Sequence, residues 1–236
     1  MLGTLAFLIS TVAAGGGALV LIPLASLVLP VEMIPPVLGI ASLVSSTQRV
    51  ALYRKDVERP ILVRVVPGLV FGIVVGSLLL VRLEANGLRL CLGVFLLASA
   101  LLPYLLPRMS WPRLSLAWFV PAAAVTAFLS TVMGAAGPLM NPVYLGHGLA
   151  RERMIGTKAA STWLMQAMKL VSYAVAGLLA SGLVWSAGLA LAAGALVGNV
   201  VGKKVLSGMS DERFRHCVRA LLLVSGALMI RRALAG

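Results

Sequence analysis

The chain consists almost entirely of long apolar segments, and this feature constrains its fold more than any other. An α-helix needs about 20 residues to cross the hydrocarbon core of a bilayer, and most of the segments reach this length. The stretches between them leave no room for a soluble domain. The sequence therefore predicts an all-α polytopic membrane protein with eight apolar segments, at Leu2–Leu29, Met33–Tyr53, Ile61–Val81, Leu88–Leu106, Leu114–Leu149, Met154–Leu179, Leu183–Val205 and Cys217–Ile230.

The composition excludes a soluble protein. The chain is 60% hydrophobic and 11% charged, whereas soluble domains are about 45–50% apolar and about 25% charged. A net charge of +13 would suggest nucleic-acid binding in a soluble chain. Sparse basic residues between apolar runs instead follow the positive-inside rule of membrane proteins. We therefore expect a lipid bilayer around the chain and no nucleic-acid partner.

Enzymatic and metal sites are disfavoured as well. The sequence shows no cluster of a nucleophile, a base and an orienting residue, so we expect no enzyme. Cys91 and Cys217 lack the spacing of metal ligands or of a disulfide framework, and all seven acidic residues lie near segment ends. Because hard cations need oxygen ligands and usually carboxylates, we expect no metal site. No pattern in the sequence points to a cofactor.

Two of the segments are interrupted at membrane depth. The first contains Gly15-Gly16-Gly17, and the fifth contains Gly134-Ala135-Ala136-Gly137-Pro138. Lipid cannot hydrogen-bond the backbone groups that such a break frees, so a break is tolerated only inside protein or beside a cavity. A helix that restarts after the break presents unpaired N–H groups and the positive end of its dipole, which suit an anion. Pro138 fits the first position of such a helix.

The chain also contains an internal repeat. Three glycines at four-residue spacing recur 126 residues later: Gly68, Gly72 and Gly76 correspond to Gly194, Gly198 and Gly202. We interpret this stripe as a helix-packing surface without a ligand. Nearer the N-terminus the offset is 117 residues, which relates Gly39 to Gly156. The chain thus divides into two related halves, residues 1–110 and 111–236, each with one broken segment followed by three spans.

The positions of the basic residues favour one membrane topology. If all eight segments cross, the 19 Lys and Arg residues other than Lys169, each assigned to its nearest loop or terminus, divide nine to ten between the two faces. If both broken segments are re-entrant hairpins, they divide fifteen to four, which satisfies the positive-inside rule. Each half then has three crossings, so the halves are inverted repeats and both termini lie outside. Inverted repeats are common in secondary transporters, which bind substrate near the midplane.

Polar and basic residues in the spans that follow the breaks suit an oxyanion. They include Ser42, Ser45, Ser46, Thr47, Gln48 and Arg49 in the first half, and Thr157, Lys158, Ser161, Thr162, Gln166 and Lys169 in the second. On a helix Thr157, Ser161 and Thr162 lie close to one face, which Gln166 and Lys169 continue, and Asn141 adds an amide. The candidate substrate-binding residues are Gly15, Gly16, Gly17, Ala18, Ser45, Gln48, Gly134, Gly137, Pro138, Asn141, Thr157, Ser161, Thr162, Gln166 and Lys169.

Lys169 is the leading candidate for substrate contact, because it lies deep in its span without an evident acidic partner. The alternative is that its long side chain extends to the membrane interface. Arg49 lies nearer the end of its span, where an interfacial position is favoured over a binding role.

The broken segments and the spans after them resemble a known family. The strings GGGALVLIPL and VLGIASLVSS, and again MGAAGPLMNPVYL and MIGTKAAST, are similar to the duplicated signature of the TauE/SafE (TSUP) sulfite exporter family. The resemblance covers nearly the whole chain. It implies that the signature residues line the substrate path: Gly15, Gly16, Gly17, Pro23, Gly39, Gly134, Gly137, Pro138, Pro142, Gly156 and Thr157.

The second break reads GAAG in place of a glycine triplet, and Gly39-Ile40 stands where the family often has Gly-Thr. The first half therefore supplies fewer hydroxyl groups near its break.

The resemblance implies a transporter of small sulfur oxyanions. We expect an exporter of sulfite, thiosulfate or an organosulfonate in the bacterial plasma (inner) membrane, working by alternating access around the two broken-helix tips. An interior-negative membrane favours anion efflux by about 2.3 kcal/mol per charge per 100 mV. Two alternatives remain open: a proton-coupled importer of a sulfur anion or small carboxylate, and a membrane accessory subunit that transports nothing. No pattern in the sequence determines the oligomeric state.

Cysteine labelling tests the inversion of the two halves. Inverted repeats place the equivalent residues Cys91 and Cys217 toward opposite membrane faces, so a membrane-impermeant maleimide is expected to label them from opposite sides. The variants Cys91→Ala and Cys217→Ala separate the two signals. Labelling of both cysteines from the same side, or a disulfide between them, contradicts the inversion.

Overall fold

The structure, a computed structural model, describes residues 22, 25, 26, 28–105, 114–149, 151–206 and 211–235. Every regular element in these ranges is a helix, which agrees with the predicted all-α class. The first broken segment lies almost wholly outside the described residues, and with it the candidates Gly15, Gly16, Gly17 and Ala18.

Six long helices cover the predicted spans that follow the two broken segments. They are α3 (Ile34–Tyr53), α4 (Arg59–Arg82), α5 (Ala85–Leu105), α8 (Arg151–Val175), α9 (Gly182–Leu206) and α10 (Asp211–Ala235). Most extend beyond the predicted ends. Helix α8 stops four residues early, because the chain turns at Gly177, whose φ is +74°.

Two helices in the described ranges are by themselves long and apolar enough to cross a membrane. They are Arg59–Arg82 and Leu116–Met133. Helix α8 has the length but carries Glu152, Arg153, Lys158 and Lys169 among its 25 residues. The polar residues that made this segment a candidate for substrate binding also lower its mean hydropathy, so it is not among the two helices above.

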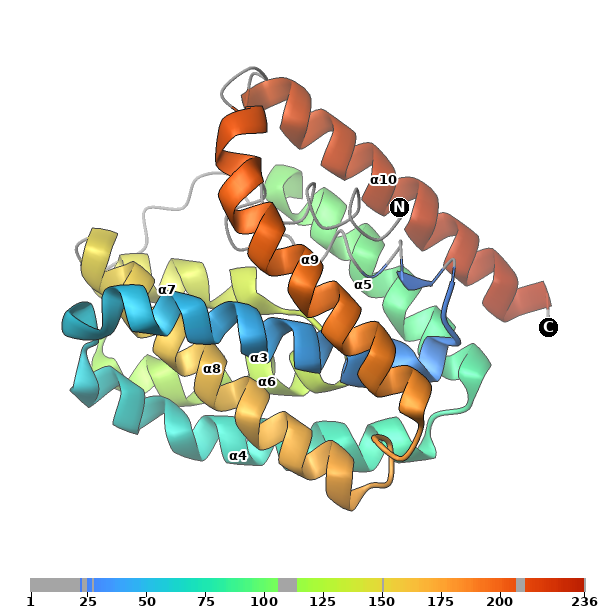
Figure 1. Ribbon diagram of the computed structural model, residues 1–236, viewed down its shortest axis with the longest axis horizontal. Helices are drawn as coiled ribbons and strands as arrows, with labels where there is room; N and C mark the ends of the chain where they lie inside the picture. The colour runs from blue at the N-terminus through green and yellow to red at the C-terminus, as the bar shows by residue number, and fades with distance from the viewer. Residues whose placement is uncertain are drawn as a thin grey trace.

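The helices form a bundle and a flanking pair (Figure 1). Helices α3, α4, α6 (Phe119–Met133) and α8 run side by side, and α9 crosses over α3. Helices α5 and α10 pack together on one flank. A core that includes Val65, Leu69, Ala123, Tyr144 and Met165 joins α4, α6 and α8 to the short helix α7 (Asn141–Gly146).

The glycine stripe of α4 packs directly against α6. A Cβ atom on Gly68 would overlap the carbonyl oxygen of Val120, and one on Gly72 would overlap that of Ala124. At Gly76 a Cβ would lie 2.9 Å from Cβ of Thr131. The packing interpretation of these three glycines is therefore confirmed.

The broken segment of the second half folds back on itself. Helix α6 ends at Gly134, whose φ is +85°. A short 3-10 helix, η4 (Gly137–Met140), and then α7 follow. At the base of this hairpin Leu114 N donates to the carbonyl oxygen of Gly146 at 2.9 Å, and His147 Nδ1 lies 2.8 Å from the carbonyl oxygen of Leu114. Residues 114–149 thus end beside the point where they begin.

Contacts between α3 and α8 follow the offset found in the sequence. A Cβ on Gly39 would lie 3.3 Å from Leu170 Cδ2, and one on Gly156 would lie 2.8 Å from the carbonyl oxygen of Tyr53. The same 117 residues relate Gly39 to Gly156 and Tyr53 to Leu170. Each helix therefore contacts the other through equivalent positions, as a pair related by internal symmetry would.

Replacing Gly72 by Ala tests the α4–α6 contact. We expect Gly72→Ala to lower stability by about 1–3 kcal/mol, because the added methyl overpacks against a helix backbone. Thermal unfolding in detergent micelles measures the effect. The matched control is Gly182→Ala, at a position where a Cβ meets nothing within 4 Å. Equal stability of Gly72→Ala and Gly182→Ala would contradict the close approach of the α4 backbone to the α6 backbone.

Candidate functional site

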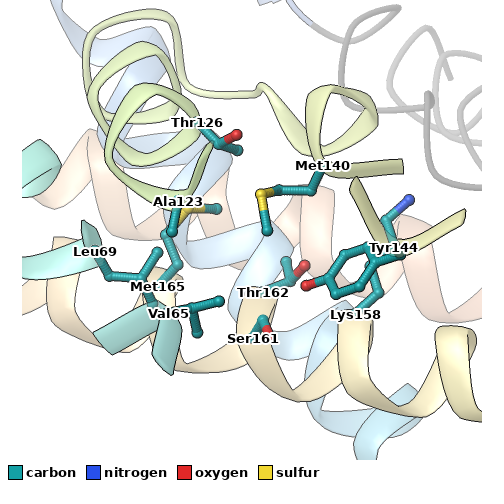
Figure 2. A pocket seen from close by; sticks show the side chains of 10 residues that line it. All are labelled: Val65, Leu69, Ala123, Thr126, Met140, Tyr144, Lys158, Ser161, Thr162 and Met165. Atoms are coloured by element: carbon teal, nitrogen blue, oxygen red, sulfur yellow. The ribbon is translucent and has the colours of Figure 1, made fainter. Parts of the chain in front are cut away.

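A pocket lies beside the hairpin, where α4, α6, α7 and α8 meet (Figure 2). Its volume is about 330 Å³ when the part open to the surroundings is included. Val65 and Leu69 of α4 and Ala123 of α6 form an apolar side, and most of the polar groups come from α8 and the hairpin. The lining residues are Val65, Leu69, Ala123, Thr126, Met140, Tyr144, Lys158, Ser161, Thr162 and Met165.

One face of α8 supplies most of the polar lining. Lys158, Ser161 and Thr162 stand three and four residues apart, which puts them on one side of a helix. Figure 2 shows them beside the ring of Tyr144. Ser161 Oγ donates to the carbonyl oxygen of Thr157 at 2.8 Å, and its side chain also interacts with the Tyr144 hydroxyl. Hydroxyl groups from two helices therefore face one pocket.

Lys158 joins α8 to the hairpin. Its Nζ donates to Asn141 Oδ1 at 2.7 Å. An ammonium group has three N–H donors, so two remain for another acceptor. The sequence predicted Asn141 as an amide donor, but its carbonyl oxygen accepts from Lys158 here, which leaves the NH₂ group to donate.

The site is electropositive. Arg153 Nη1 pairs with Glu58 Oε1 at 2.7 Å, and in the described part of the chain neither Lys158 nor Lys169 forms an ion pair. The same ranges hold no group of three or more His, Cys, Asp or Glu side chains that could bind a metal ion. Ammonium and hydroxyl donors without a carboxylate neighbour are suited to an anion.

Lys169, the leading candidate from the sequence, contacts helix α6 and is not among the residues that line the pocket. It is fully buried, and its Nζ donates to the carbonyl oxygen of Ser130 at 2.8 Å and to Ser130 Oγ at 3.0 Å. One turn on, the Tyr173 hydroxyl donates to the carbonyl oxygen of Thr131 at 2.6 Å. Both carbonyls belong to the last turn of α6, where helical N–H partners run out. That of Ser130 also accepts from the backbone N–H of Gly134 at 2.9 Å. Lys169 and Tyr173 therefore cap the helix at its break.

Extension of Lys169 to the interface is thereby ruled out, because the side chain does not reach the protein surface. The pocket is lined instead by Lys158, which lies 11 residues earlier on α8.

The remaining candidates are distributed as follows. Thr157 Oγ1 accepts from the backbone N–H of Glu58 at 2.9 Å and so ties α8 to the start of α4. Gln166 is 3% exposed, and its Oε1 has no hydrogen-bond partner. Ser45 and Gln48 are half-buried on α3.

The restart of the helix differs from the prediction. Gly137 and Pro138 belong to the 3-10 helix η4, and α-helical bonding begins only at Asn141 and lasts for six residues. A helix this short aligns few peptide dipoles, so the predicted anion site at its N-terminus is weak. Lys158, held against Asn141, supplies the positive charge instead.

Sequence reasoning missed Tyr144 and Thr126 in the pocket and Ser130 at the cap. Tyr144 follows Asn141 by three residues in the string NPVYL. An aromatic residue at this helical spacing predicts a side chain packed in the hydrophobic core, so it was not a candidate for the pocket. Thr126 and Ser130 lie four residues apart in a helix whose other polar residue is Thr131. That spacing, toward the break, is the one signal that would have found them.

The chain was compared with families, curated proteins and solved structures. The family model described as "Sulfite exporter TauE/SafE" matches residues 1–229 of the 236. No curated protein and no solved structure matches.

The cap at the break is tested by Tyr173→Phe. This change keeps the ring but removes the donor to the Thr131 carbonyl oxygen, and leaving a buried polar group unpaired costs about 1–3 kcal/mol. We expect a loss of thermal stability in that range. Tyr53→Phe, at a half-exposed ring on α3, is the control and is expected to be neutral. Equal melting temperatures of Tyr173→Phe and Tyr53→Phe would contradict the capping role of Tyr173.

Proposed function

Because the chain belongs to the sulfite exporter TauE/SafE family, a family of membrane transporters, we propose that it exports a small sulfur oxyanion across the bacterial plasma membrane. The observation that carries this proposal is Lys158. Its ammonium group lines the pocket and forms no ion pair in the described part of the chain. One of its three N–H donors binds Asn141, so two can bind an anion.

The pocket suits sulfite, thiosulfate or a small organosulfonate. The charged oxygens of such an anion accept hydrogen bonds from Lys158, from the Asn141 amide and from the hydroxyl group of Thr162. Val65 and Leu69 provide an apolar wall for the sulfur or a short alkyl group. Ser161 donates its proton to the carbonyl oxygen of Thr157, so its oxygen accepts from the Tyr144 hydroxyl, which it holds in place at the pocket edge.

The proposed topology has two re-entrant hairpins in inverted halves, with both termini outside. The contact between Leu114 and Gly146 supports a hairpin that returns to its starting face. The Arg153–Glu58 ion pair and the Thr157–Glu58 hydrogen bond bring the first turns of α8, with the loop before them, to the loop between α3 and α4. Both loops are rich in Arg and Lys, as the positive-inside rule requires of the cytoplasmic side.

Export needs no separate coupling ion in this proposal. The interior-negative potential moves an anion outward by about 2.3 kcal/mol per charge per 100 mV. The hairpin and α8 meet at Asn141 and Lys158. An oxyanion that binds Lys158 in place of Asn141 would release the hairpin from α8. This release provides a conformational step for alternating access.

Sulfite efflux from proteoliposomes tests the assignment. We expect Lys158→Gln to reduce the flux by about tenfold or more, since a hydrogen bond to a charged group contributes about 1.5–3 kcal/mol. Lys55→Gln, at an exposed residue outside the pocket, serves as the control and retains the flux. A folded Lys158→Gln protein with unchanged flux contradicts the site. A wild-type protein that moves no sulfur oxyanion contradicts the function.

A further inference from the structure

A second basic residue, Arg49, belongs to the stretch of α3 that packs against the part of α8 that carries the pocket lysine. Trp163 Nε1 donates to Thr47 Oγ1 at 3.0 Å, and Gly156 packs on the carbonyl oxygen of Tyr53. Residues 47–53 of α3 therefore lie against residues 156–163 of α8. Arg49 belongs to the first of these stretches and Lys158 to the second.

Arg49 has an unmet donor. Its Nε is buried and has no hydrogen-bond partner. Arg49 and Lys158 lie on the two stretches of α3 and α8 that pack together, and the positive charge of Arg49 acts on the Lys158 amine. The buried Nε without a partner and the repulsion between two half-buried cations both raise the free energy of the empty site.

The nearest acidic residues do not neutralise this pair. Asp56 and Glu58 follow α3 in the chain, and Glu58 pairs with Arg153. In the ranges that the structure describes, neither carboxylate forms an ion pair with Arg49 or Lys158. A bound anion is therefore needed to balance both charges.

The two cations have different geometries. A guanidinium is a planar fork that binds two oxygens of one oxyanion, whereas an ammonium is a compact point charge. An anion with a single negative charge satisfies one of them. An anion with two charges, spread over several oxygens, satisfies both.

We propose that Arg49 and Lys158 together form a site for a doubly charged oxyanion, so that the transporter selects dianions over monoanions of similar size. The inference rests on the proposed function and narrows its substrate class. It assigns to Arg49 a role in selectivity, and to Lys158 the binding of either kind of anion.

The experiment compares thiosulfate, a dianion, with methanesulfonate, a monoanion, by calorimetric titration in neutral detergent at fixed pH and ionic strength. The wild-type protein is expected to bind thiosulfate at least about tenfold more tightly. Arg49→Gln should weaken thiosulfate binding by about tenfold and methanesulfonate binding by less than about twofold, so that the preference is lost. Arg49→Lys, which keeps the charge, should restore part of the preference.

The control is Arg54→Gln, at an exposed arginine in η2 (Arg54–Asp56), which should leave both affinities unchanged. An unaltered preference in folded Arg49→Gln overturns the inference, as does a wild-type protein that binds both probes equally. Equal binding leaves the proposed transport of sulfur oxyanions standing, whereas failure to bind either probe overturns that as well.

Arg49 can also meet the phosphate group of a lipid. Titration is therefore repeated with phosphatidylglycerol added to the micelles. Thiosulfate binding that persists supports the anion site. Binding that is abolished by the lipid in the wild type, and not in Arg49→Gln, shows that Arg49 holds a headgroup and overturns the inference.

Discussion

The structure depends on one constraint, which is that a helix broken inside a membrane must still satisfy its backbone carbonyl groups. Helix α6 ends at Gly134, and its last turn is capped by Lys169 and Tyr173 from α8. Because these donors come from a neighbouring helix, the break also fixes where α8 lies. The chain can then turn back, and Asn141 at the start of α7 meets Lys158 on the same face of α8.

Close packing sets the other side of the site. The glycines of α4 let its backbone approach that of α6 until a Cβ atom would not fit. Val65 and Leu69 of α4 are thereby brought to the pocket edge, opposite the hydroxyl groups of α8. The pocket consequently has an apolar wall and a basic, hydroxyl-rich wall. This division suits a small oxyanion, whose charge needs donors and whose remaining surface does not.

The sequence predicted the helices well, because a membrane requires long apolar segments and the loops between them are short. It also predicted that Ser161 and Thr162 share a face, since helical periodicity places them there. It did not predict that Lys169 binds a backbone carbonyl oxygen of another helix, outside the lining of the pocket. A sequence shows which cations lack an acidic partner, but it does not show which carbonyl groups of a distant helix they contact.

The amino-acid sequence by itself determined the all-helical class, the break at Gly134 and an excess of positive charge with no carboxylate in the spans. Composition and local periodicity suffice for these, since each follows from the solvent that surrounds the chain. Only the tertiary structure decided that Lys158 lines the pocket while Lys169 caps a helix. That choice depends on distances between α6, α7 and α8, and those are set by packing between residues far apart in the chain.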